Sequence, residues 1–205
     1  NTEYMEMCDQ KGFPYQGRFV INPGKGYNIE TETRPIDAVC PNCGGKIIQT
    51  RFGYACVNHL SINSLCNFII PNFICNRYIT VEEAEDFCNG NGDILDGFLN
   101  KQGKWFSAYL TSGEKGSVEL SSIIGKCPAC GQDFLVGPTA FNCSNFRHGC
   151  DFKIWRHKVN LHDAKELLAH GKLRRPFEAF DKLGHVHALT LQVGFHNEIQ
   201  VTPYK

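Results

Sequence analysis

Apolar residues alternate with polar residues in three segments of the chain, and each segment follows a glycine. The three glycines are Gly12, Gly103 and Gly184. The matching positions, three, seven, fifteen and seventeen residues later, are Tyr15, Phe19, Tyr27 and Ile29; Phe106, Leu110, Val118 and Leu120; and His187, Leu191, Ile199 and Val201. Alternation on both sides of a short polar stretch is typical of a β-hairpin. We therefore predict the same β-hairpin at three places in the chain.

Two other segments place apolar residues at the three- and four-residue spacing of an α-helix. The first begins after Thr80, which is an N-cap candidate because Glu83 completes a capping box, and it ends at Gly90. The second begins after Asn160 and ends at Gly171. The pattern thus predicts one short helix before the second hairpin and one before the third.

Two cysteine clusters precede these helices, and their spacing is nearly the same. The first is Cys40-x2-Cys43-x12-Cys56-x9-Cys66, and the second is Cys127-x2-Cys130-x12-Cys143-x6-Cys150. An alternating apolar stretch follows each last cysteine, at residues 68–70 and 152–154, and predicts a strand there. The chain therefore contains an internal repeat.

Together these patterns predict an α+β fold made of tandem small modules. Each module is a ribbon closed by four cysteines, followed by a helix and a β-hairpin. We predict that residues 1–38 are the hairpin tail of a preceding, truncated repeat, that residues 39–122 form repeat 1, and that residues 123–205 form repeat 2. The alternative for residues 1–38 is an unrelated β-hairpin, since short alternating strands look alike.

The sequence contains eleven cysteines, and either disulfides or metal sites could explain them. Two cysteines separated by two residues on a tight turn can place both thiolates on one tetrahedral ion, and this arrangement occurs twice. An odd total also argues against complete pairing. We expect two Zn²⁺ ions per chain, held by Cys40, Cys43, Cys56 and Cys66 and by Cys127, Cys130, Cys143 and Cys150. Four thiolates saturate zinc, so both sites are expected to be structural.

Five other residues bear on the cysteine chemistry. His59 and His148 are alternative ligands, although the two copies agree better in cysteine. Cys88 lies on the apolar face of the first predicted helix, so we expect a small buried core residue there. Cys8 and Cys75 have no partner at ligand spacing, and we interpret them as free thiols.

Common catalytic and membrane-spanning patterns are absent from the sequence. It has no nucleotide-binding glycine-rich loop and no His-Glu-x-x-His motif, and proline lies inside each Cys-Pro-x-Cys knuckle instead of before it, unlike the Pro-Cys-x-x-Cys of the zinc deaminases. It also has no apolar run long enough to cross a membrane and no secretory signal at its start. We therefore expect a cytoplasmic, non-enzymatic chain without a membrane or a small-molecule substrate. Because it starts without Met, we interpret it as a fragment or a processed product.

The last part of the chain is more basic than the rest. The net charge is zero, yet residues 123–205 carry eleven basic and seven acidic side chains. Proteins that bind single strands combine exposed aromatic rings with cations that follow the phosphates. The candidates for such contacts are Phe141, Phe146, Arg147, Trp155, Arg156 and Lys158 in repeat 2, and Arg51, Phe52, Tyr54 and Arg77 in repeat 1.

These candidates differ in strength. Trp155 and Arg156 are favoured, because neighbouring residues in a strand lie on opposite faces. One face would then present an aromatic ring and the other a cation. Tyr54 and Phe141 have a core position as their alternative, because so small a ribbon needs aromatic residues inside. A further basic run, Lys172, Arg174 and Arg175, is expected to be a solvated surface.

The order of these motifs resembles a known family. The first copy has Cys40-Pro-Asn-Cys43-Gly44, Tyr54-Ala-Cys56, Cys66-Asn-Phe68 and Gly103-Lys-Trp-Phe106-Ser-Ala108-Tyr-Leu110. The second has Cys127-Pro-Ala-Cys130-Gly131, Phe141-Asn-Cys143 and Cys150-Asp-Phe152-Lys-Ile154. Over about residues 40–203 this pattern resembles the C-terminal zinc-ribbon repeat region of bacterial type IA DNA topoisomerases.

The resemblance implies single-stranded DNA as a partner, together with the catalytic core of a parent topoisomerase. It also implies an accessory role, in which the strand-cleaving residues belong to a part of the parent outside this sequence. The alternative is a protein–protein interaction or spacer module that docks on another nucleic-acid enzyme. A binding role predicts an affinity that falls steeply with salt.

Overall fold

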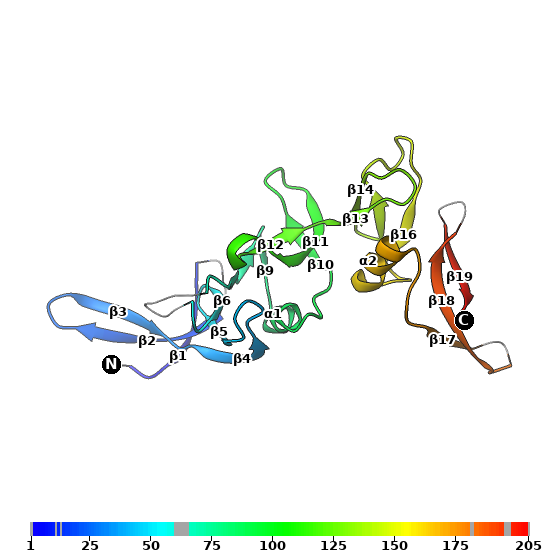
Figure 1. Cartoon of the computed structure of the whole chain (residues 1–205). Coiled ribbons are helices and arrows are strands. Elements are labelled where there is room, and N and C mark those ends of the chain that lie inside the picture. The colour runs from blue at the N-terminus through cyan, green and yellow to red at the C-terminus, as the bar shows by residue number, and fades with distance from the viewer. Residues whose placement is uncertain are drawn as a thin grey trace. The chain divides into compact units, whose positions relative to one another are not determined.

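The protein is mostly β-structure, arranged in two compact units (Figure 1). The computed structural model describes residues 2–10, 12, 14–59, 66–180, 183–194 and 198–204. Unit 1 comprises residues 1–92, 97–105 and 110–120, and unit 2 comprises residues 93–96, 106–109 and 121–205. Strands account for 49% of the structure and helices for 11%. The predicted α+β class is therefore wrong. The two helices are short, and each ribbon and each hairpin gains a strand that its sequence pattern did not predict.

Each cysteine cluster lies on a four-stranded antiparallel sheet. Ribbon 1 consists of β4 (Arg34–Val39), β5 (Lys46–Thr50), β6 (Gly53–Cys56) and β7 (Ile69–Pro71), paired in that order. Ribbon 2 consists of β13 (Ile123–Lys126), β14 (Asp133–Val136), β15 (Ala140–Cys143) and β16 (Lys153–Trp155). A two-stranded sheet, β8 (Phe73–Ile74) with β9 (Arg77–Tyr78), follows ribbon 1.

The two ribbons share one strand register. Ile47 pairs with the third cysteine, Cys56, in ribbon 1, and Phe134 pairs with the third cysteine, Cys143, in ribbon 2. The aromatic residue two positions before that cysteine also has equivalent partners, since Tyr54 pairs with Ile70 and Phe141 pairs with Ile154. Because a shift of one residue would turn every side chain to the other face, this agreement confirms the internal repeat.

The three predicted hairpins are present, and each belongs to a three-stranded antiparallel sheet. The sheets are β1 (Met5–Cys8), β2 (Pro14–Asn22) and β3 (Gly26–Thr31); β10 (Leu95–Leu99), β11 (Trp105–Ser112) and β12 (Val118–Ser121); and β17 (Phe177–Phe180), β18 (Val186–Val193) and β19 (Ile199–Pro203). A short 3₁₀ turn, Glu114–Gly116, connects β11 to β12.

The repeated glycine lies in the turn that joins each hairpin to the additional strand before it. Gly12, Gly103 and Gly184 lie in the turn before the second strand with φ of +86°, +73° and +83°, a region that favours glycine. The register of the hairpin that follows is also shared, since Phe19 pairs with Ile29 and Leu191 pairs with Val201. The sequence pattern identified the hairpin but not the strand before its glycine.

The two helices begin and end where the sequence predicts. The helix α1 (Val81–Cys88) has Thr80 as its N-cap, and Thr80 and Glu83 form the complete capping box. The helix α2 (Leu161–His170) has Asn160 as its N-cap and ends at Gly171, which takes a left-handed conformation. No helix in the described part of the chain is long and apolar enough to cross a membrane.

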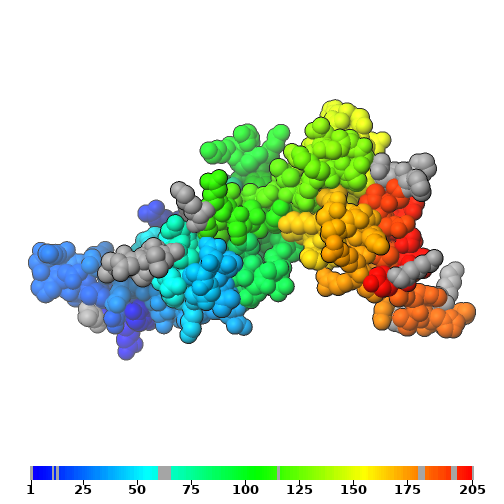
Figure 2. Space-filling view, viewed as in Figure 1, coloured from blue at the N-terminus to red at the C-terminus, as the bar shows by residue number. Residues whose placement is uncertain are grey.

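The core of unit 2 joins ribbon 2, α2 and the last hairpin. Leu161, Ala164 and Leu167 of α2 are buried in the same cluster as the ribbon residues Phe134, Phe141, Phe152 and Ile154. Leu173 and Leu191 belong to that cluster as well. Figure 2 shows the α2 region in orange lying against the C-terminal strands in red. The ribbon is therefore not an isolated finger, because one face of it is covered by the helix and the hairpin.

Candidate metal centres and nucleic-acid interface

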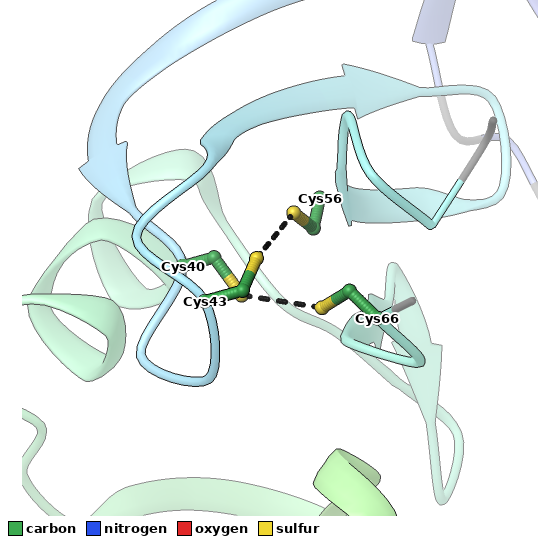
Figure 3. Close-up of side chains that lie close together, drawn as sticks. All are labelled: Cys40, Cys43, Cys56 and Cys66. Atoms are coloured by element: carbon green, nitrogen blue, oxygen red, sulfur yellow. Dashed lines mark hydrogen bonds between the residues drawn. The ribbon is translucent and has the colours of Figure 1, made fainter. Parts of the chain in front are cut away.

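The first cysteine cluster brings four sulfur atoms to one point in unit 1. Figure 3 shows Cys40 and Cys43 on the turn after β4, Cys56 at the end of β6 and Cys66 just before β7, with their sulfur atoms directed toward one another. The Sγ atoms of Cys40 and Cys66 are 3.6 Å apart, and those of Cys43 and Cys56 are 3.5 Å apart. All four lie within 4.8 Å of one another.

The second cluster repeats this arrangement in unit 2. The Sγ atoms of Cys127 and Cys150 are 3.7 Å apart, those of Cys130 and Cys143 are 3.3 Å apart, and all four lie within 4.8 Å. The turn between the first two cysteines is also the same, since the amides of Gly44 and Gly131 each donate to the carbonyl of the first cysteine at 2.8 Å. In both clusters three cysteines are buried and the second one is exposed.

The sulfur positions fit a tetrahedral metal ion. With Zn–S bonds of about 2.3 Å, the edge of such a tetrahedron is about 3.8 Å, close to the spacing of the paired sulfur atoms. Both clusters can therefore hold a metal ion with four thiolates. Such a set leaves no open position for water or substrate, which agrees with a structural role.

The cysteines of one cluster differ in acidity. Burial raises the pKa of the Cys40 thiol to about 12. A hydrogen bond from the Asn58 amide, with backbone donors beside it, lowers the pKa of the exposed Cys43 thiol to about 6. A buried thiol gives up its proton when a cation replaces it, because the thiolate is the metal ligand. The cluster thus combines one thiol that loses its proton easily, that of Cys43, with buried thiols that ionise when a metal ion binds.

The alternative histidine ligands lie outside both clusters. The Nδ1 atom of His59 is 3.1 Å from the carbonyl oxygen of Cys66, which orients the ring toward the backbone. His148 is exposed, and only cysteines make up the second group of metal-ligating side chains. Outside the clusters, Cys88 is buried as predicted, while Cys8 and Cys75 are exposed free thiols.

Two of the predicted nucleic-acid contacts are core residues. Tyr54 is 1% exposed, and its hydroxyl donates to the carbonyl of Ile79 at 2.8 Å. Phe141 is fully buried in the core of unit 2. Neither ring can stack on a base in the folded ribbon. The core interpretation, left open by the sequence, is therefore the right one for both residues.

Two predicted cations are engaged in ion pairs within the protein. Arg77 pairs with Glu83, and its guanidinium lies 5.2 Å above the ring centroid of Phe98. Arg156 forms two hydrogen bonds to the carboxylate of Asp96, at 2.9 and 3.0 Å. Arg156 also follows the end of β16 and so does not occupy the strand face assigned to it. Both cations belong to the fold, and we remove them from the set of candidate contacts.

Three of the remaining repeat 2 candidates, Phe146, Arg147 and Trp155, gather around Lys153 on one side of ribbon 2, which we call the Trp155 face. The Nζ atom of Lys153 lies 4.3 Å from the ring centroid of Trp155 and 5.7 Å from that of Phe146. The guanidinium of Arg147 lies 5.6 Å from the ring centroid of Phe146. Aromatic rings and cations are thus interleaved on this face.

Lys153 was missed by the sequence analysis although a signal for it exists. It stands two positions before Trp155 in β16, and residues two apart share one face of a strand. The buried residues Phe152 and Ile154 alternate with them toward the core. Beside this face runs a groove of about 510 Å³, whose lining includes Lys153, Trp155 and Lys158. The predicted candidate Lys158 therefore lies at the same site.

Ribbon 1 offers a smaller exposed patch. Phe52 is 65% exposed, and the guanidinium of Arg51 lies 4.7 Å from its ring centroid. The residues of ribbon 1 that correspond to Lys153 and Trp155 are Ile69 and Pro71. The strand β7 of ribbon 1 therefore has no counterpart of the Lys153–Trp155 pair.

Comparisons with known proteins address the region between the two clusters. Residues 65–121 match the family described as "C-terminal repeat of topoisomerase". The matched region runs from the fourth cysteine of ribbon 1 through α1 to β12. The chain is 36% identical over 139 residues to "DNA topoisomerase 1" of Bacillus anthracis, an alignment that covers 62% of this chain and 15% of that relative. No solved structure matches the chain. The resemblance to topoisomerase C-terminal repeats, drawn from the cysteine and hairpin motifs, is confirmed.

Proposed function

We propose that this chain, whose residues 65–121 match the C-terminal repeat of topoisomerase, is the accessory part of a DNA topoisomerase that binds single-stranded DNA. In this proposal the catalytic core of the parent enzyme is the second partner, and its strand-cleaving residues lie outside this sequence. The chain spans about 15% of its relative, so the activity of a whole enzyme is part of the proposal. The Trp155 face is the single observation that carries the binding role.

The physical support is the combination of rings and cations on that face. Bases of any sequence can stack on an exposed ring, and each stack contributes about 1–3 kcal/mol. Lys153 and Arg147 are close enough to the rings to meet the phosphates on either side of a stacked base. We further propose that zinc occupies both cysteine clusters, because four thiolates in a tetrahedron are the common structural zinc site. Such sites need reduced thiols, which implies the cytoplasm as the compartment.

Tryptophan fluorescence tests the proposal directly. The chain has two tryptophans, so Trp105→Phe leaves Trp155 as the sole tryptophan to be excited selectively. Trp105 is 71% exposed, and its replacement should not disturb the core. Titration with an oligothymidylate should quench the emission of Trp155, because the ring stacks on a base. The quenching should weaken as salt is added, because binding releases counterions from the strand.

Substitutions on the face then measure its contribution. Trp155→Ala should weaken binding of a fluorescein-labelled oligothymidylate about 5- to 150-fold, the equivalent of one stack. Lys153→Ala should lower the slope of log affinity against log salt by about 0.7. Lys126→Ala serves as the matched control, because Lys126 is already paired with Asp133 at 2.7 Å. Unquenched Trp155, or an affinity that salt does not change, would refute the proposal.

A further inference from the structure

The C-terminal sheet carries a second groove that the Trp155 face does not include. It has a volume of about 530 Å³ and lies between the segment after α2 and the strands β18 and β19. Its lining includes Lys172 and Arg174, two members of the basic run for which the sequence predicted only a solvated surface. Figure 2 shows this segment in orange next to the red strands.

A buried leucine explains how both cations reach the groove. Leu173 is 6% exposed and belongs to the core of unit 2. Its amide donates to the carbonyl of Leu191 at 2.9 Å, and Lys172 forms an antiparallel bridge with Gln192. The segment therefore runs like a strand beside β18, where successive side chains point to opposite sides. Leu173 is itself part of the groove lining, and it anchors the segment so that its neighbours Lys172 and Arg174 line the groove as well.

The rest of the lining is neutral and includes an aromatic ring. Tyr204 is 44% exposed, and its hydroxyl donates to the carbonyl of Arg174 at 3.0 Å, which fixes the ring at the groove. Thr190, Gln192 and Thr202 add neutral polar groups, and no acidic residue is among the lining residues in the described part of the chain.

Two titratable groups lie close to Arg174 outside the lining. The carboxylate of Glu166 accepts a hydrogen bond from the backbone amide of Arg174 at 3.0 Å, and Nδ1 of His170 is 3.3 Å from its guanidinium. Glu166 thus binds the backbone of the segment, and the side chain of Arg174 stays exposed.

We propose that this groove is a second site for a single nucleic-acid strand, in which Lys172 and Arg174 contact phosphates and Tyr204 stacks on a base. The inference rests on the proposed function and adds a place on the C-terminal sheet to it. The basic pair is specific to repeat 2, because the residues at the same distance after Gly90 of repeat 1 are Asn91 and Asp93. A strand held here and on the Trp155 face would contact unit 2 at two separate patches.

The salt dependence of binding tests the groove. Fluorescence anisotropy with a labelled 25-nucleotide oligothymidylate compares the full chain with its Lys172→Ala/Arg174→Ala variant. Loss of two phosphate contacts should lower the slope of log affinity against log salt by about 1.4, which is two contacts at about 0.7 each. Arg175→Ala is the matched control, because Arg175 belongs to the same basic run but is not among the groove residues. It should leave the slope unchanged.

Tyr204 supplies a second, independent test. Tyr204→Phe removes the hydroxyl and keeps the ring, so binding should persist, whereas Tyr204→Ala should weaken it several-fold. Circular dichroism confirms that each variant is folded, and Lys172→Arg/Arg174→Lys should restore the slope.

The outcomes separate this inference from the proposed function. Quenching of Trp155 together with an unchanged slope in the Lys172→Ala/Arg174→Ala variant would overturn the groove and leave the Trp155 face standing. Absence of any binding by the full chain would overturn both. Competition by polyglutamate as strong as that by unlabelled oligothymidylate would also overturn the groove, because it would assign the surface to acidic proteins.

Discussion

Arg156 shows how a single residue can be misassigned when only its neighbours in sequence are known. Its place beside Trp155 indicated an exposed cation, but its partner Asp96 stands sixty positions earlier in the chain. The guanidinium also donates to the carbonyls of Gly137 and Pro138 at 3.1 and 2.9 Å. Its side chain is only 18% exposed as a result. A long-range partner of this kind leaves no trace in local alternation.

The structural role of Arg156 predicts that its loss affects stability rather than binding. Arg156→Ala should lower the free energy of unfolding by about 1–2 kcal/mol, because it removes a paired charge and leaves two carbonyls without that donor. Urea unfolding followed by circular dichroism measures the change. The salt slope of oligothymidylate binding should stay the same. A lower slope with unchanged stability would return Arg156 to the binding face.

Tyr54 makes a comparable case inside ribbon 1. Burial raises the pKa of its hydroxyl, which stays protonated and donates to Ile79. Tyr54→Phe should therefore lower the free energy of unfolding by about 1 kcal/mol, because the buried carbonyl of Ile79 loses its donor. Phe52→Leu is the control, since Phe52 is 65% exposed and should change the same urea midpoint very little. Equal midpoints for Tyr54→Phe and the unaltered chain would contradict this account.

At the scale of elements, the sequence predicted the hairpins, which repeat, and the helices, which have capping residues as a local signal. The capping residues Thr80 and Asn160 fix the helix starts through their own side chains, so both helices could be located. The hairpins follow strict alternation after a glycine and were located too. The strands β4 and β13 were not, because their pairing shifts register at a bulge and alternation fails there. These added strands, with those before each hairpin glycine, explain why the α+β class was wrong.

The candidate site was predictable to the same extent. Cysteine spacing identified both clusters, because the Cys-x2-Cys knuckle and the intervals to the third and fourth cysteines can be read directly from the sequence. The exposure of Trp155 could be anticipated from the strand period, and the burial of Tyr54 and Phe141 could not be decided. Choosing between core and surface for an aromatic residue depends on what covers it. For Phe141 that covering comes in part from α2, which follows ribbon 2 in the chain.

At the scale of the whole molecule, the two cysteine clusters lie in separate units, so removing a ligand from one should leave the other intact. Cys43→Ser and Cys130→Ser remove equivalent exposed ligands from ribbon 1 and ribbon 2. Native mass spectrometry should find two zinc ions in the unaltered chain and one in each variant, because a three-thiolate set binds zinc less tightly. Quenching of Trp155 by oligothymidylate should survive Cys43→Ser and be lost in Cys130→Ser, because only ribbon 2 presents the Trp155 face.

A third variant is the control for this comparison. Cys88→Ser changes a buried cysteine outside the clusters, and it should keep both zinc ions. Loss of both metal ions from Cys88→Ser, or loss of Trp155 quenching in Cys43→Ser, would show that the two units depend on each other for folding. Either result would count against separate metal-stabilised units.

The shared register of the two ribbons makes them interchangeable frameworks for a surface. Phe68 and Ile70 in ribbon 1 stand where Phe152 and Ile154 stand in ribbon 2, and all four point into their cores. The exposed positions between and after them differ, with Ile69 and Pro71 in place of Lys153 and Trp155. Gene duplication could thus diversify the outer positions of one copy without repacking its interior. By the same logic, a protein engineer could transplant the ring-and-cation pair to ribbon 1 with Ile69→Lys and Pro71→Trp.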